Sequence, residues 1–101
     1  MMRIFFERTG GFAGMRFAAT IEVDKLPEAD AHTLRNLVDE ADFFDLPEKV
    51  LKYAVPDEFL YTITIETDKK RHTLHTSDSA ATDDLRALLD ELSRRARAQR
   101  R

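Results

Sequence analysis

The chain contains no cysteine and no tryptophan, and it holds only three glycines and three prolines. Without cysteine it can form no disulfide and offers no thiolate. This composition is typical of a cytoplasmic protein, which is the location we predict. No apolar run approaches the ~20 residues of a membrane-spanning helix. The first residues also lack the apolar core of a signal peptide. We therefore expect neither a membrane partner nor a secretion signal.

Basic residues are concentrated at one end of the chain. Five of the 16 lie in residues 93–101, which hold no acid, so the other 92 residues carry 11 basic and 19 acidic side chains, a net charge of −8. We predict a single α+β domain over residues 1–92 and an Arg-rich helix end or tail over 93–101. The tail either contacts nucleic acid or another acidic partner, or is a solvated helix end. The acidic body favours the solvated helix end over nucleic-acid binding.

Alternating side chains predict strands, arranged as two hairpins. Residues 15–23 and 59–67 alternate apolar and polar positions, as half-buried strands do. The first of these follows the β-forming residues 2–8, and the second is followed by residues 70–76, so each pair reads as a hairpin. Residues 48–58 carry turn signals, and we predict a loop there, with or without a short helical turn.

Two further segments carry the apolar spacing of an amphipathic helix. The first opens near Pro27 and ends before Pro47, and the second follows the turn at residues 77–79, with Thr82 as an alternative N-cap. The apolar positions are Leu34, Leu37, Val38 and Ala41 in the first helix, and Leu85, Leu88, Leu89 and Leu92 in the second. The order ββαββα predicts an α+β fold, a four-stranded antiparallel sheet with both helices on one face.

The glycines give the clearest indication of function. All three fall in the stretch Gly10, Gly11, Phe12, Ala13 and Gly14, between the first two predicted strands. Glycine permits positive φ and close backbone approach, so the stretch predicts a hairpin loop. A plain turn needs no phenylalanine at its tip. Phe12 either folds back on the core as an anchor or is an exposed apolar tip, which is typical of a binding hot spot.

The sequence shows no arrangement of side chains that predicts catalysis, a metal site or a cofactor. His72 and His75 are three apart in a predicted strand, so they point to opposite faces, and His32 lacks a helical partner. The Gly-rich stretch lacks the ending of a phosphate loop. The hydroxyl residues near position 77 lack a neighbouring base. We therefore expect a binding protein that is not an enzyme.

Three segments together resemble a known family. They are RIFFERTGGFAGMRF, ADFFDLP and FLYTITIETDKKRHTLHTSD, and they contain Gly10–Gly14, Phe43–Pro47, Phe59–Ile65 and Ser77–Asp78. The combination is similar to the emfourin-like family, small bacterial inhibitors of protealysin, a thermolysin-like zinc metallopeptidase. The resemblance runs from about Arg3 to Leu92 and leaves out the Arg-rich end.

The resemblance implies a protein that binds and blocks a thermolysin-like metallopeptidase. We expect the 10–14 loop to dock at the mouth of the peptidase cleft with Phe12 as its apolar anchor. Glycines would allow the loop backbone to approach the cleft closely. The alternative is an interaction module or accessory subunit that uses the open face of the sheet, where Arg16, Thr62, Thr64 and Glu66 are predicted to lie. The oligomeric state is left open.

Overall fold

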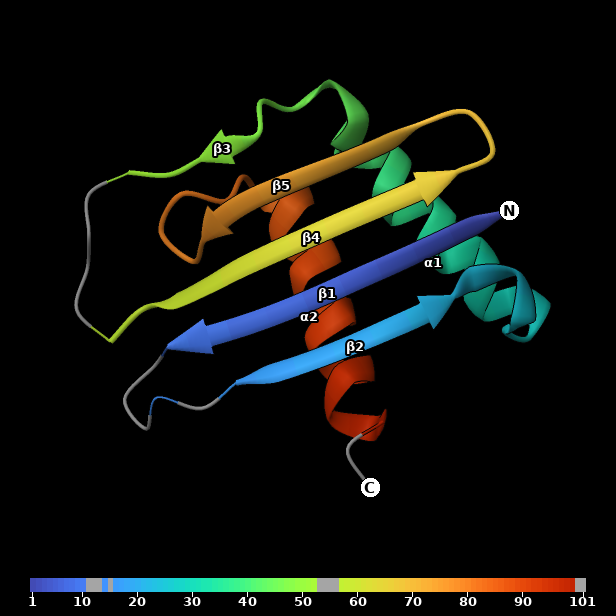
Figure 1. Cartoon of the computed structure of the whole chain (residues 1–101), viewed down its shortest axis with the longest axis horizontal. Coiled ribbons are helices and arrows are strands. Elements are labelled where there is room, and N and C mark those ends of the chain that lie inside the picture. Colours follow the sequence, from blue (N-terminus) through green and yellow to red (C-terminus); the bar gives the residue numbers. More distant parts are fainter. Residues whose placement is uncertain (11–13, 15, 53–56, 100–101) are drawn as a thin grey trace.

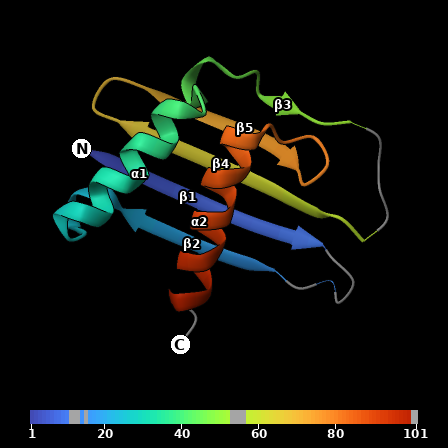
Figure 2. The same cartoon turned by 180° about the vertical axis from the view of Figure 1, so that it is seen from behind.

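A β-sheet covered on one face by two helices organises the described part of the chain (Figures 1 and 2). The structure, a computed structural model, describes residues 1–10, 14, 16–52 and 57–99. The strands are β1 Met2–Gly10, β2 Phe17–Glu22, β3 Lys49–Val50, β4 Phe59–Thr67 and β5 Arg71–Ser77. The helices are α1 Glu28–Glu40 and α2 Asp83–Gln99, with short 3₁₀ turns η1 Val23–Lys25 and η2 Phe43–Asp45. Both predicted hairpins and both predicted helices are therefore confirmed.

The sheet departs from the predicted four antiparallel strands. Its order over the described residues is β2-β1-β4-β5-β3, and β3 runs parallel to β5. The fifth strand falls inside segment 48–58, for which a loop or a short helical turn was wrongly predicted. It is only two residues long and is held by a few bonds: the His75 amide donates to the Glu48 carbonyl at 2.7 Å, and the Thr76 hydroxyl to the Val50 carbonyl at 2.8 Å. Two residues are too few to show the alternation of apolar and polar positions from which the other strands were predicted.

The first hairpin joins the second through its own first strand. β1 lies between β2 and β4 and is antiparallel to both, so Ile4 is opposite Ile21 on one side and Ile65 on the other. The inner face of these strands forms the core together with the helices. Its fully buried members include Ile4, Val23, Leu34, Phe43, Ile63, Ile65, Leu74, Leu85, Leu88, Leu89 and Leu92.

The helix boundaries follow local backbone chemistry. Asp42 after α1 adopts a left-handed φ of 52°, which turns the chain into η2. The Leu85 amide donates to the Thr82 hydroxyl at 3.3 Å, so Thr82 is the N-cap of α2. This helix extends through the start of the Arg-rich segment to Gln99 and buries Ser93 and Ala96. All of residues 93–99 thus belong to α2.

Candidate functional site

β1 ends and β2 begins at the same end of the sheet, and the Gly-rich stretch joins them in the sequence (Figure 1). Of the five predicted site residues, the structure describes Gly10 and Gly14. Gly11, Phe12 and Ala13 lie outside the described residues. The start of β4 lies at the same end of the sheet, because Gly10 is opposite Phe59. The site is therefore described through the strand ends that flank the connection.

Gly10 occupies a position that no other residue type fits without strain. Its φ is +92°, and a Cβ atom placed on it would lie 2.6 Å from the carbonyl oxygen of Glu58. Such a separation is far inside van der Waals contact, and the oxygen is a backbone atom that cannot swing away. The entry to the connection is thus packed directly against the segment that leads into β4.

Gly14 also has a left-handed backbone, but its surroundings are open. Its φ is +61°, and a Cβ atom built there would have no atom within 4 Å. Left-handed geometry favours glycine, because a side chain would crowd the following carbonyl. The two described glycines therefore serve different purposes, close packing at Gly10 and chain reversal at Gly14.

Arg8, two residues before Gly10, is a buried cation held between two aromatic rings. Its side chain shares the inner face with Ile4 and Phe6, and the residue is only 9% exposed. The guanidinium carbon lies 4.6 Å from the centre of the Phe17 ring and 4.1 Å from that of Phe59. These rings belong to the first residues of β2 and β4, so one side chain contacts the ends of both neighbouring strands.

A hydrogen-bond network lies beside this cation. Tyr61, opposite Arg8 in the register, donates its hydroxyl to Asp78 Oδ1 at 2.7 Å. Burial, followed by the bond to Asp78, raises the pKa of Tyr61, so the phenol stays protonated. Arg86 of α2 donates to the Asp78 carbonyl and lies 3.7 Å from its carboxylate. The network ties the strand ends to the turn before α2.

Glu58 connects the start of β4 to the same turn. Its carboxylate accepts a hydrogen bond from the Ser79 amide. Hydrogen bonds from Ser79 hold the pKa of Glu58 below its ordinary value. The carbonyl of this residue is the one against which Gly10 packs, so its position is fixed from two sides.

Two exposed leucines lie close to this end of the sheet. Leu60 is 51% exposed and Leu51 is 49% exposed. They line a shallow hollow of about 330 Å³ with Thr9, Lys49 and His75. Because Thr9 is opposite Leu60 and directly precedes Gly10, this apolar surface is continuous with the base of the connection.

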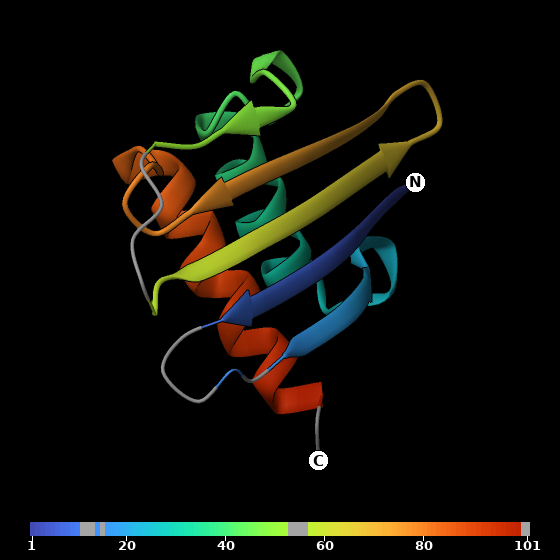
Figure 3. The same cartoon turned by 60° about the vertical axis from the view of Figure 1, so that its left-hand side comes forward.

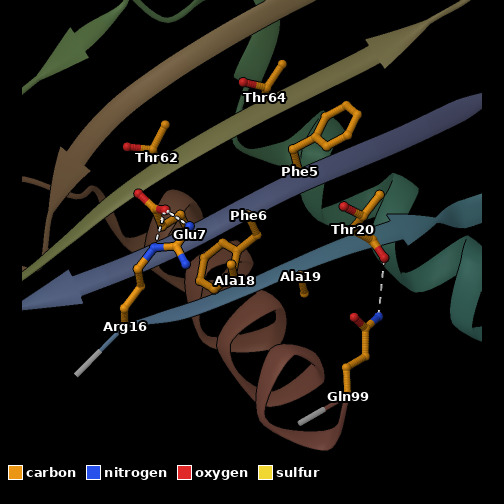
Figure 4. A pocket seen from close by; sticks show the side chains of 10 residues that line it. All are labelled: Phe5, Phe6, Glu7, Arg16, Ala18, Ala19, Thr20, Thr62, Thr64 and Gln99. Atoms are coloured by element: carbon orange, nitrogen blue, oxygen red, sulfur yellow. Dashed lines mark hydrogen bonds and ion pairs between the residues drawn. The ribbon is translucent and has the colours of Figure 1, made fainter.

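A second hollow lies on the same open face of the sheet, and Thr62 lines both hollows (Figure 4). A hollow of about 470 Å³ is lined there by Phe5, Glu7, Thr62 and Thr64, among others. Arg16 Nε donates to Glu7 Oε2 at 2.7 Å, and Gln99 of α2 donates to the Thr20 carbonyl at 3.3 Å. The predicted open-face residues Arg16, Thr62, Thr64 and Glu66 all lie on this side of the sheet, although Thr64 is only 9% exposed.

The histidines lie apart, each with its own structural contact. The ring of His72 lies edge-on to Phe43 at 5.5 Å, whereas His75 Nδ1 is 3.1 Å from the Thr62 hydroxyl on the open face. His32 contacts Asn36 within α1. Within the described ranges, no group of three or more potential ligands is placed to hold a metal ion. In the same ranges, no helix is long and apolar enough to cross a membrane.

Sequence reasoning missed Arg8, Phe17 and Phe59 as a group. A signal was present, because Arg8 continues the period-two series of Ile4 and Phe6 onto the buried face. An arginine in phase with core residues needs a partner for its charge. The sequence did not show that the partners would be rings from two different strands.

Comparison with known proteins supports one family. A family model described as Emfourin matches residues 6–93, which include all of α1 and the first part of α2. Among solved structures, emfourin from Serratia proteamaculans, described as an M4 family peptidase inhibitor, matches with 18% identity and a TM-score of 0.45. That match covers 86% of this chain and 84% of the other. No curated protein matches the chain.

Proposed function

The chain belongs to the emfourin family, and from this premise we propose that it inhibits a thermolysin-like zinc metallopeptidase by binding at the active-site cleft. The binding element is the connection of residues 10–14, with Phe12 as the apolar side chain that enters the cleft. Family membership supports the inhibitor role. The exposed Gly14, next to the ends of β1 and β2, supports the choice of binding element.

The strand ends that flank the loop are held by contacts that exist before any partner binds. Gly10 packs against the Glu58 carbonyl, and Arg8 joins the ends of β1, β2 and β4. A loop anchored on both sides loses less conformational freedom when it binds, so more of the contact energy appears as affinity. The exposed Leu60 and Leu51 add apolar surface beside the loop, which suits a partner whose cleft accepts large apolar side chains.

Inhibition is measured by titrating a thermolysin-like metallopeptidase with the protein and following hydrolysis of a short peptide substrate. We expect saturable loss of activity that is competitive with the substrate. No inhibition of several such peptidases by a folded sample would contradict the proposal. The genomic position of the gene gives a cheaper check, because a thermolysin-like peptidase encoded beside it would favour this function.

Phe12→Ala tests the role of the loop. We expect it to weaken inhibition by at least ~2 kcal/mol, the scale of a hot-spot residue, because the largest apolar side chain of the loop is removed. Phe5→Ala is the matched control, since Phe5 lies on the open sheet face away from the loop. Unchanged inhibition by a folded Phe12→Ala protein would exclude this anchor.

The alternative is a protein-interaction module that uses the open face. The observation that favours it is the hollow lined by Phe5, Glu7, Thr62 and Thr64. The same pair of variants separates the two functions, because a partner seated on the open face would be lost with Phe5→Ala and retained with Phe12→Ala.

A further inference from the structure

The side chain of Arg8 is a buried cation in contact with two aromatic rings, and a contribution to stability does not by itself explain this arrangement. Replacing a buried ion pair by apolar residues of similar volume is often neutral or stabilising, so burial of a charge is weak evidence for a role in stability. Arg8 is nevertheless 9% exposed, and its Nε has no hydrogen-bond partner among the described residues. Its guanidinium carbon lies 4.6 Å and 4.1 Å from two ring centres, and its side chain also interacts with the Tyr61 hydroxyl, which lowers the pKa of Tyr61 against the larger effect of burial. A planar cation stacked between rings fixes the rings as well as itself.

The two rings belong to the first residues of β2 and β4. Figure 3 shows the start of these two strands beside the end of β1. Phe17 is the first residue of β2, where the chain leaves the loop, and Phe59 is the first residue of β4. Phe17 is directly opposite Arg8, whereas the residue opposite Phe59 is Gly10. Because Gly10 has no side chain, the Phe59 ring has room to lie over Arg8. The stack therefore joins three strand ends at the point where the loop is attached.

We propose that Arg8 is a positioning residue for inhibition: stacked between Phe17 and Phe59, it holds the strand ends that carry the 10–14 loop in one arrangement before the peptidase binds. This inference rests on the proposed function and adds a buried residue that would act through the strand ends. With both strand ends fixed, less ordering is left to occur on binding, so Arg8 acts on the rate and strength of binding from outside the contact surface.

The test compares Arg8→Met with Arg3→Met. Both variants remove one positive charge from β1, but Arg3 lies at the far end of the strand, paired with Glu22 and Glu66. Methionine fills the space of Arg8 without supplying a planar cation. We expect Arg8→Met to stay folded, to raise the inhibition constant about tenfold, and to lose amide protection at residues 8–10 and 17–18. Arg3→Met should also stay folded, but it should leave both the inhibition constant and the amide protection of these residues unchanged.

Two substitutions of Phe59 separate the effect of ring stacking from that of apolar packing. Phe59→Tyr keeps the ring and should retain inhibition, whereas Phe59→Leu removes it and should reproduce the effect of Arg8→Met. Phe59→Leu also replaces Arg8→Met if that variant fails to fold. Unchanged inhibition and protection in a folded Arg8→Met protein would overturn the proposal, as would a uniform loss of protection across the sheet.

The amide exchange measurement keeps the two proposals distinguishable. If the wild-type protein inhibits no thermolysin-like peptidase, the proposed function fails, and exchange alone then decides the role of Arg8. Local loss of protection at the strand ends would support positioning by Arg8. Unchanged protection there would overturn it.

Discussion

Two glycines in the same connection differ in how much the fold depends on them. At Gly10, positive φ combines with a carbonyl oxygen 2.6 Å from the position of any Cβ atom, whereas Gly14 has positive φ alone. Backbone strain at a positive φ is independent of neighbours. A clash with a main-chain atom requires two segments to move apart. The consequences of substitution should therefore be unequal.

Gly10→Ala should lower the free energy of unfolding by about 2–4 kcal/mol, because left-handed strain and overpacking act together. Gly14→Ala is the control and should lower it by about 1–2 kcal/mol through strain alone. Denaturant titration of the two variants measures both values. Equal losses would show that the Glu58 carbonyl moves freely and that Gly10 is not packed as described.

At the level of elements, the last turns of α2 are held by charge pairs within the helix and to α1. Glu91 accepts hydrogen bonds from Arg94 and from Arg95 Nε, the latter at 2.6 Å, and Arg95 also lies 3.5 Å from Asp30 of α1. Burial would raise the pKa of Glu91, but the bonds from the two arginines outweigh it and lower the pKa. Two arginines of the basic segment therefore have acidic partners within the fold.

Arg95→Met should lower the free energy of unfolding by roughly 1 kcal/mol, because Arg95 loses its largely covered ion pair with Glu91 within α2 and its more exposed pair with Asp30 of α1. Arg97→Met removes the same charge from an exposed position of the same helix and should change stability little. Thermal unfolding of the two variants measures the difference. Equal destabilisation by the two variants would show that the loss of a positive charge from α2 lowers stability, and that the ion pairs of Arg95 do not.

The lowered pKa of Glu91 also predicts a dependence on pH. A carboxyl group with a depressed folded-state pKa stabilises the fold fully above its unfolded value, 4.5 for this group, and loses that contribution as pH falls through the folded value. Glu91→Gln should therefore be less stable than wild type at neutral pH and lose less stability on acidification below 4.5. Parallel acid-unfolding curves for the two proteins would contradict this account.

Regular elements could be predicted from the sequence because each repeats a pattern over many residues. The alternation of β4 and the apolar stripe of α2 determine their type whatever surrounds them. The strand β3 could not be predicted, because Lys49 and Val50 form it only by pairing with a strand some 25 residues later. The stack on Arg8 was missed for the same reason, since its rings come from β2 and β4.

Across the whole molecule, charges form a row over the open face at the end opposite the loop. Glu22, Arg3, Glu66 and Arg71 stand in register on β2, β1, β4 and β5. Arg3 Nη1 lies 3.3 Å and Arg71 Nη1 lies 3.5 Å from the carboxylate of Glu66, which therefore links two arginines. Alternating charges directly opposite one another stabilise strand pairing.

Glu66→Gln should lower the free energy of unfolding by roughly 1 kcal/mol in low salt, because it leaves two arginines without their shared partner. The difference should shrink as salt rises, since screening weakens the pairs in the wild-type protein. Glu40→Gln at the exposed end of α1 makes the same change of charge and serves as the control. A difference that is independent of salt would show that the row does not act through charge.

The direction of β1 also determines where a label or a solid support can be attached without obstructing the loop end of the sheet. This strand starts at Met2 and ends at Gly10, so the amino terminus and the glycine-rich connection lie at opposite ends of one nine-residue rod, a separation of roughly 25 Å at the usual rise per residue. A carrier, dye or chip surface joined through the amino terminus would sit far from the connection. Immobilised in that orientation, the molecule would leave its loop end directed into solution, as a biosensor or an affinity resin requires.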